Sequence, residues 1–282
     1  MPQTINTNLA SLNAQRNLNT SQMSLSVSMQ RLSSGLRVNS AKDDAAGLAI
    51  AERMNTQVRG MGVAMRNAND GISMAQVAEG ALSKVGDALQ RMRELALQAR
   101  NATNSESDKD SLQKEFLQLQ AEITRVVGGT AFNGKSILGA DATSFTFQIG
   151  ANVTSDDVVT IDFENLKSNT EISTVTVSTA SIGSGIGISA IASVIIGIDD
   201  AINIVNDSRA KFGATQSRFE AIISNLQVAV ENQSAARSRI MDADFAAETA
   251  ALARAQILQQ AGNAMVAQAN QLPQQVLRLL GN

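Results

Sequence analysis

The positions of the prolines constrain the fold of this chain more than any other feature. The chain contains two prolines, Pro2 and Pro273, so residues 3–272 have none. Proline lacks a backbone N–H and breaks or kinks the interior of a helix. A proline-free stretch of this length leaves room for helices of many turns. The sequence therefore favours long helices wherever its apolar residues follow a helical period.

Apolar residues recur at coiled-coil spacing near both ends of the chain. The spacing predicts one helix over residues 4–33 and another from about Asp242 to Leu280, in which Pro273 should kink or weaken the final turns. Intervals of three, four and seven residues place apolar side chains along one face of a helix. The predicted assembly seam of these terminal helices consists of Leu18, Leu25, Met29, Leu32, Met265, Leu272, Val276 and Leu279.

Three more helices are predicted between the terminal helices. A long one should run from about Asp43 to Arg100, ahead of a polar break at 101–110. The next carries Leu112, Phe116, Leu119, Ile123 and Val126 and should end at Gly128-Gly129. Helical period returns after Ala190, and one heptad register connects apolar residues from Ile198 to Ile240. These patterns are typical of narrow helix–helix contacts, as is the low aromatic content of 3%.

The centre of the chain changes to the period of a strand. Alternation over 145–149 and 159–163 predicts two strands joined by a hairpin loop at 150–157. Residues 172–179 are rich in valine and threonine and suggest a third strand. Residues 181–189 are rich in glycine and serine and read as a linker.

Together these elements predict a mainly α protein. We expect a long antiparallel coiled-coil-like helix bundle built from both chain ends, with a small central β-hairpin region near residues 140–180. In this plan residues 1–42 and 240–282 form terminal helices, and residues 43–239 form a helical rod that contains the hairpin region and the linker.

Charge is sparse at both ends of the chain. Residues 1–42 carry only Arg16, Arg31, Arg37 and Lys42, and residues 255–282 carry only Arg278. Exposed helix faces normally carry glutamate, lysine and arginine. Two interpretations follow: a coiled coil solvated by glutamine, asparagine and serine, or faces buried against copies of the same chain. The second implies that the ends become ordered only on assembly.

Composition argues against most catalytic and metal chemistry. The chain has no cysteine and no histidine, and its net charge of −3 does not indicate a nucleic-acid partner. The acidic pairs Asp43-Asp44, Asp156-Asp157 and Asp199-Asp200 are interpreted as structural, the first and last near helix starts. We therefore predict no enzyme activity, catalytic residue, metal site or cofactor. The amino terminus lacks the pattern of a cleaved signal peptide, and no apolar run reaches the roughly 20 residues needed to span a membrane.

Two terminal motifs resemble the signatures of bacterial flagellins. The sequence SSGLRVNSAKDDAAGLAIAERM at 33–54 is similar to the amino-terminal signature, and ARSRIMDADF at 236–245 to the carboxyl-terminal one. The resemblance covers residues 1 to about 165 and about 190 to 282, with little between them. It implies a short flagellin with little or no variable outer domain.

The resemblance also implies a function and a location. A flagellin is a structural subunit that polymerises into the helical, extracellular flagellar filament used for motility, after export without a cleaved signal. Implied partners are further copies of the chain, an export chaperone, and the cap and hook-junction proteins. Two alternatives stay open: a hook–filament junction protein of the same family, and an enzyme hosted in the central segment, which is short for a catalytic domain.

The resemblance finally implies recognition by a host innate immune receptor, Toll-like receptor 5. The carried-over contacts are Arg91, Leu95, Gln98 and Glu115. Because Leu89, Met92 and Ala96 occupy the predicted core stripe, we expect Arg91 and Leu95 to be exposed together on another face. The alternative is that this face packs against neighbouring subunits in the filament.

Overall fold

The computed structural model describes the backbone of residues 7–280 and the side chains of residues 7–271. Its internal contacts divide the chain into two compact units. The terminal unit comprises Met1–Thr56 and Glu231–Asn282, and the central unit comprises Gln57–Val230. Both ends of the chain thus belong to one unit, and the middle of the chain forms the other.

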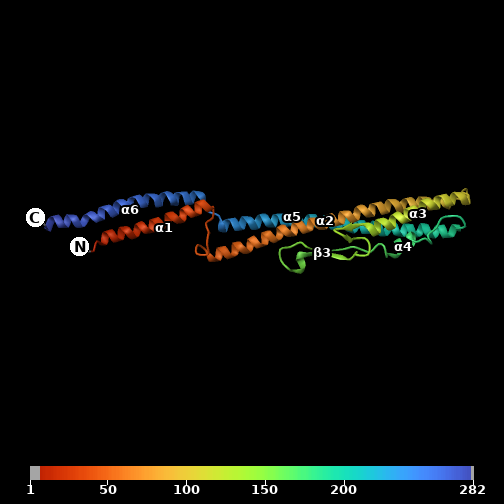
Figure 1. Ribbon diagram of the computed structural model, residues 1–282, viewed down its shortest axis with the longest axis horizontal. Coiled ribbons are helices and arrows are strands. Elements are labelled where there is room, and N and C mark those ends of the chain that lie inside the picture. The colour runs from red at the N-terminus through yellow and green to blue at the C-terminus, as the bar shows by residue number, and fades with distance from the viewer. Residues whose placement is uncertain (1–6, 281–282) are drawn as a thin grey trace. The chain divides into compact units, whose positions relative to one another are not determined.

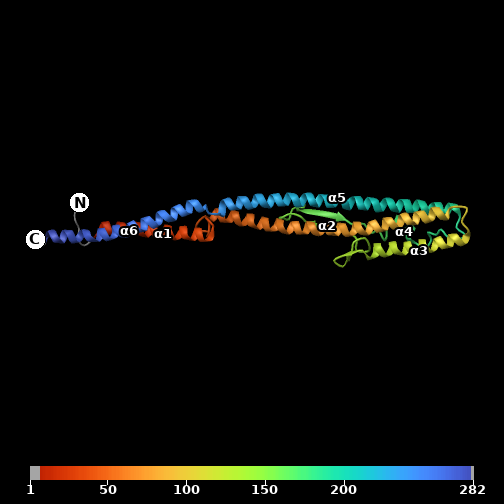
Figure 2. The same cartoon turned by 90° about the horizontal axis from the view of Figure 1, so that it is seen from above.

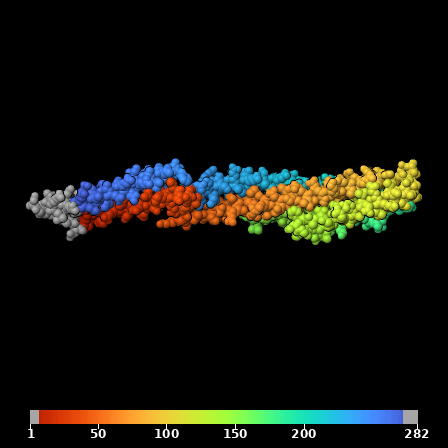
Figure 3. Space-filling view, turned by 45° about the horizontal axis from the view of Figure 1, so that its top comes forward, coloured from red at the N-terminus to blue at the C-terminus, as the bar shows by residue number. Residues whose placement is uncertain are grey.

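The terminal unit contains a pair of antiparallel helices, α1 (Leu9–Ser34) and α6 (Phe245–Leu280). They lie side by side in the ribbon and space-filling views, the red and blue helices of Figures 1 and 3. The pairing of the two chain ends confirms the predicted helix pair. Asn8 caps α1, because its side chain accepts a hydrogen bond from the Ser11 N–H at 3.1 Å. The helix α6 continues through Pro273.

A short polar connection follows α1 in the terminal unit. Gly35 has a φ of +71°, the left-handed conformation that ends helices at little cost for glycine. The Arg37 guanidinium donates two hydrogen bonds, of 2.7 and 3.2 Å, to the Ile240 carbonyl. Leu36 and Asp242 form an antiparallel bridge. The segment after α1 is therefore tied to the segment that precedes α6.

The central unit is organised around parts of α2 (Ala45–Ala99) and α5 (Ile188–Met241), with α3 (Glu106–Gly129) packed beside them (Figure 2). The predicted heptad register of α5 is confirmed by four residues spaced by seven, Ile198, Val205, Phe212 and Phe219, all of which are buried. By length and hydropathy α5 could cross a membrane, but these positions lie in the core of the unit. On α3, Ser105 and Asp108 form a reciprocal capping box.

Two hairpins follow α3. Strands β3 (Ser144–Gln148) and β4 (Val158–Asp162) pair antiparallel, as predicted, with Phe147 opposite Val159. The Phe147 ring meets Phe219 of α5 edge to face at 5.7 Å, which fixes the hairpin to the helices. The smaller hairpin, β1 (Ala131–Phe132) and β2 (Lys135–Ser136), was not predicted. The sequence feature that could have predicted it is the dipeptide Asn133-Gly134. Both residues have a positive φ, 49° and 80°, and two-residue hairpin turns with positive φ favour Asn-Gly.

The predicted third strand at 172–179 is wrong, because most of that segment is helix α4 (Thr170–Thr176). Asn169 caps its start by accepting hydrogen bonds from the Glu171 and Ile172 N–H groups. At the other end the buried Gln120 amide donates to the carbonyls of Val175 at 2.7 Å and Ala180 at 3.0 Å. Side chains therefore provide hydrogen-bond partners for the backbone groups at both ends of this short helix, and one of these side chains is distant in sequence.

Candidate assembly and recognition surfaces

The contact between α1 and α6 consists largely of small and polar residues. Its buried members are Ser11, Ser28, Ala255 and Ala269. The Ser11 hydroxyl donates to the Asn270 side-chain oxygen at 2.7 Å, and the Asn8 amide donates to the Ala269 carbonyl at 2.7 Å. Such contacts align the two helices while removing little apolar surface from water.

Leucines contribute to this contact without being fully buried. Leu18, Leu25 and Leu32 are half-buried, in agreement with a seam on this face of α1. Leu18 lies against Gly262 so closely that an added Cβ at Gly262 would be 3.1 Å from the Leu18 Cδ1. Glycine at this position therefore allows the close approach of α6 to a leucine of α1.

Two predicted seam residues are not part of the helix contact. Met29 is 53% exposed and Met265 is 61% exposed, so neither is buried between α1 and α6, and their place in an assembly seam stays a prediction. The spacing of both residues matches the helical period. That period does not determine which face of each helix packs against the other helix. Leu272, Val276 and Leu279 lie on the backbone of α6, and their side chains are outside the described residues.

The terminal helix pair turns large apolar side chains outward. The exposed set of α1 and α6 comprises Leu9, Leu12, Met23, Val27, Met29, Ile257, Leu258 and Met265. A groove of about 430 Å³ runs between the helices from Ala10 to Ser21 on one side and from Leu258 to Met265 on the other. Because exposed apolar surface of this extent marks interaction sites, this pair is a candidate assembly surface.

The predicted recognition residues divide into exposed and buried positions in the central unit. The exposed Arg91 guanidinium binds Glu115 of α3 at 2.8 Å and Glu94 of α2 at 2.9 Å. The hydrogen bonds that Arg91 donates to these carboxylates raise its pKa, with Glu115 the larger cause. Gln98 is also exposed, whereas its backbone carbonyl accepts a hydrogen bond from the Asn104 amide at 2.6 Å.

The expected exposure of Leu95 is wrong, because Leu95 is 0% exposed and belongs to the core. Leu95 lies three residues after Met92. Because both α3 and α5 pack against α2, a wider part of the α2 surface is buried than the single apolar stripe of a coiled coil. The exposed leucine nearby is Leu97, at the opposite phase of the helix. Leu95 lies outside the predicted core stripe but is buried because α2 has two neighbouring helices.

The acidic pairs have structural partners. Asp43 accepts hydrogen bonds from Ser40 and Asn39, and Ser40 is the largest cause of its lowered pKa. Asp199 binds the Arg93 guanidinium at 2.6 Å. It lies in the interior of α5, which begins at Ile188, so its expected position near a helix start is wrong. Within the part of the chain that the structure describes, no group of acidic residues is arranged to hold a metal ion.

Sequence profiles of known families match both ends of the chain. Residues 5–143 match the bacterial flagellin N-terminal helical region, and residues 195–280 match the bacterial flagellin C-terminal helical region. The stretch between them contains β3, β4, α4 and the start of α5.

Individual proteins are similar over nearly the whole chain. A flagellin of Halalkalibacterium halodurans is 45% identical, covering 98% of this chain and 99% of its own. A flagellin of Bacillus subtilis is 41% identical over the same shares. The crystal structure of Bacillus cereus flagellin is 34% identical, covers 57% of this chain and 88% of its own, and superposes with a TM-score of 0.50.

Proposed function

Because this chain belongs to the bacterial flagellin family, we propose that its terminal helix pair drives assembly through the apolar side chains it turns outward. The chain is a structural subunit of the helical, extracellular flagellar filament that serves motility. Copies of the chain are therefore its partners. The proposal concerns which of its surfaces meet in that polymer.

The single observation that carries this proposal is the reversal of polarity in the α1–α6 pair. Ser11 and Ser28 are buried between the helices, whereas Leu12 and Met265 are exposed. In a soluble coiled coil the order is the opposite, with apolar residues inside and polar residues outside. Contact with further copies would bury the outward residues and contribute about 25 cal/mol per Å² of apolar surface removed from water.

A charge placed on the outward face tests the proposal. We expect Leu12→Asp and Met265→Asp to prevent growth from filament seeds, because burying an unpaired carboxylate costs several kcal/mol, at least about 3. Leu12→Met is the matched control and should polymerise. The variants should keep the circular dichroism of the parent monomer. Normal filaments from either aspartate variant would show that this face is not an assembly surface.

The predicted seam residues near the end of α6 extend the test. We propose that Leu272→Asp and Leu279→Asp also block polymerisation, on the physical ground given for Leu12. Efficient assembly of both would limit the assembly surface to the described part of α6.

Export and accessory partners belong to the same proposal. Low charge at both ends and a small buried area favour ends that are unfolded before assembly. This supports export without a cleaved signal, in contact with an export chaperone, and incorporation beneath a cap and beyond hook-junction proteins. A structural role of this kind needs no catalytic residue or cofactor.

We also propose that Arg91, Gln98 and Glu115 form the surface recognised by Toll-like receptor 5. Leu95 supports this surface from inside the core and cannot be a direct contact in the folded unit. The Arg91–Glu115 pair joins α2 to α3 at 2.8 Å, so the two helices present one charged patch. Arginine is a frequent anchor of interfaces.

Binding of the monomer by the receptor tests this assignment. Arg91→Ala should weaken binding by about 1–3 kcal/mol if the arginine is a central anchor. Lys84→Ala, at another exposed basic residue of α2, is the matched control and should bind like the parent. Unchanged affinity of Arg91→Ala would remove this residue from the receptor surface. Impaired polymerisation of the same variant would assign the face to subunit contacts as well.

A further inference from the structure

The loop between β3 and β4 presents one apolar side chain to solvent. Val153 is 100% exposed, more than any other large apolar residue among the described side chains. It lies at the tip of the loop that connects Gln148 to Val158. The tip residues 150–155 carry no charge. Covering a fully exposed valine on an uncharged tip with another surface would remove apolar area from water and be favourable.

The loop is held in one shape by its own hydrogen bonds. The Gln148 amide donates to the Gly150 carbonyl at 3.1 Å and to the Asn152 carbonyl. The Asp157 carboxylate accepts from the Thr154 N–H and hydroxyl. A side chain at Gly150 would collide with Asp157, because an added Cβ would lie 2.6 Å from the Asp157 Cβ. The tip is therefore preorganised and projects Val153 outward.

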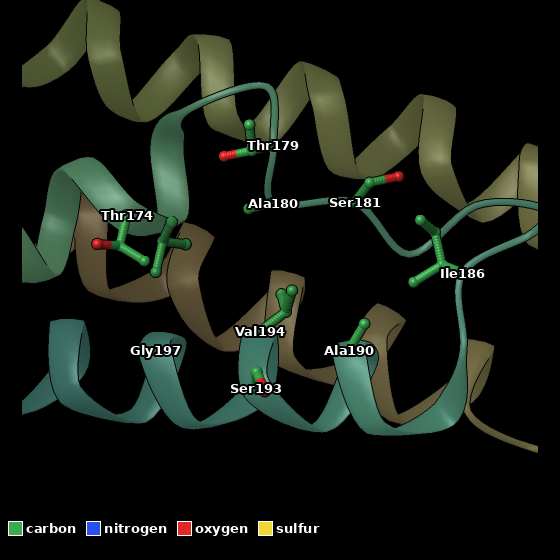
Figure 4. Close-up of a pocket in the computed structure, with 10 residues that line it drawn as sticks. Thr174, Thr179, Ala180, Ser181, Ile186, Ala190, Ser193, Val194 and Gly197 are labelled. Carbon is green, nitrogen blue, oxygen red and sulfur yellow. The ribbon is translucent and has the colours of Figure 1, made fainter.

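The same unit contains an apolar groove with no charged lining residue. It lies between α5 on one side and α4 with the following strap, residues 177–187, on the other (Figure 4). It encloses about 310 Å³, and we name it the α4–α5 groove. Its lining includes Thr174, Ser181, Ile186, Ala190, Ser193 and Gly197. Small side chains on α5 leave room that no residue of the unit fills.

The strap that forms one wall of the groove is fastened to α3. The Gln113 side-chain oxygen accepts from the Ile182 N–H at 2.7 Å. The Asp110 and Glu106 carboxylates accept from the Ser184 and Gly185 N–H groups, each at 2.8 Å. This ladder of polar side chains keeps the wall in place, so the groove is a preformed feature of the surface.

We infer that the hairpin tip of one subunit, with Val153 at its centre, inserts into the α4–α5 groove of a neighbouring subunit. A helical filament requires heterologous contacts, in which two different patches on each copy meet. The tip and the groove are two such patches, and neither carries charge. Figure 1 shows the hairpin and α4 on the same side of α2, with the loop at the end away from α4. A copy displaced along the central unit would bring one patch to the other.

This contact rests on the role of the chain as a filament subunit and is separate from the contact of the terminal helices. Cross-linking in filaments tests it, because the chain has no cysteine of its own. In filaments of the double variant Val153→Cys/Ser193→Cys, a short bismaleimide should produce a ladder of covalent oligomers, since each subunit would be linked to two neighbours. Each single variant should give no ladder.

The double variant Val153→Cys/Val228→Cys is the matched control, because Val228 is an exposed apolar residue of α5 outside the groove. Oligomers no longer than those of this control would overturn the proposed contact. Filaments would still have formed in that case, so the function of the chain would stand. Failure of the parent chain to polymerise would instead overturn the assembly role.

Substitution of the tip gives a second measurement. Val153→Asp should raise the critical concentration for polymerisation about tenfold, as expected for a buried contact residue, while Val153→Ile should remain within about twofold of the parent. Because Val153 is fully exposed, neither change should alter the unfolding of the monomer. An unchanged critical concentration for Val153→Asp would also contradict the insertion of the tip.

Discussion

The central unit and the terminal unit share the helical period but differ in what lies between their helices. In the central unit Leu82, Leu89 and Phe219 are fully buried. On α1 of the terminal unit the buried positions are serines, Leu18, Leu25 and Leu32 are only half-buried, and other large apolar residues such as Leu12 and Met23 face outward. One sequence period therefore supports two kinds of helix contact. The central unit has a core of its own, whereas the terminal pair leaves its apolar surface for other copies.

The largest expected difference between the units is in protection from proteolysis. In the monomer we expect the helices α1 and α6 to open and be cleaved more than about a thousandfold faster than the central unit, whose opening requires global unfolding. In the filament both should be protected, because neighbouring copies cover the outward apolar residues. Limited digestion followed by mass spectrometry measures this. Equal protection of the ends in the monomer and the filament would remove the distinction between the units.

The two units should also differ in how much stability a truncated side chain costs. Phe219→Ala should lower the free energy of unfolding of the monomer by about 3–5 kcal/mol, because it leaves a cavity under Phe147. Leu18→Ala, in the half-buried α1–α6 contact, should lower it by less than about 1 kcal/mol. Urea unfolding of both variants measures the difference. Similar losses would mean that the terminal pair has a core comparable to that of the central unit.

The buried amide of Gln120 tests whether polar contacts in the central unit are as important as its apolar core. Gln120→Ala should cost about 2 kcal/mol, because it leaves the Val175 and Ala180 carbonyls without a donor. Exposed Gln118→Ala on the same helix is the control and should be nearly neutral. Hydrogen exchange should show faster opening of α4 in the first variant alone. Unaltered exchange in α4 would mean that this amide does not hold the helix end.

The smallest effect is the response of two polar turns to acid. Asp157 in the central unit has a lowered pKa, chiefly because of the Thr154 hydroxyl, and Asp43 in the terminal unit has a lowered pKa, chiefly because of Ser40. A carboxyl group whose folded pKa is lowered stabilises the fold above its unfolded pKa, near 4, and this contribution is lost as the pH falls through the folded value. Both turns should therefore loosen below about pH 4.

Amide exchange of residues 152–157 between pH 5 and pH 2.5 can follow this loosening at the hairpin. Asp157→Asn should lose the pH response of this loop, whereas the turn at Asp43 should keep its own. Exchange that is independent of pH in the parent would show that the Asp157 carboxylate does not hold the tip.

Part of the candidate surface could be predicted from the residues and part could not. The spacing of Leu18, Leu25 and Leu32 placed a contact face on α1, and the structure agrees. Met29 and Met265 share that spacing and are exposed. The groove that receives the proposed contact had no sequence signal, because its walls come from α4, the strap and α5. The full exposure of Val153 could not be predicted either, because the sequence indicated only that residues 150–157 form a loop.

The long helices, the β3–β4 hairpin and the family could all be inferred from the residues, because these depend on local period, the absence of proline and terminal motifs. Tertiary structure alone decided the fate of Leu95 and of residues 172–179. Leu95 is buried because two helices flank α2, and the end of α4 is held by Gln120 of another helix, which donates a hydrogen bond to the Val175 carbonyl. Such outcomes depend on which distant groups are brought near, and a residue's own neighbours in sequence do not contain that information.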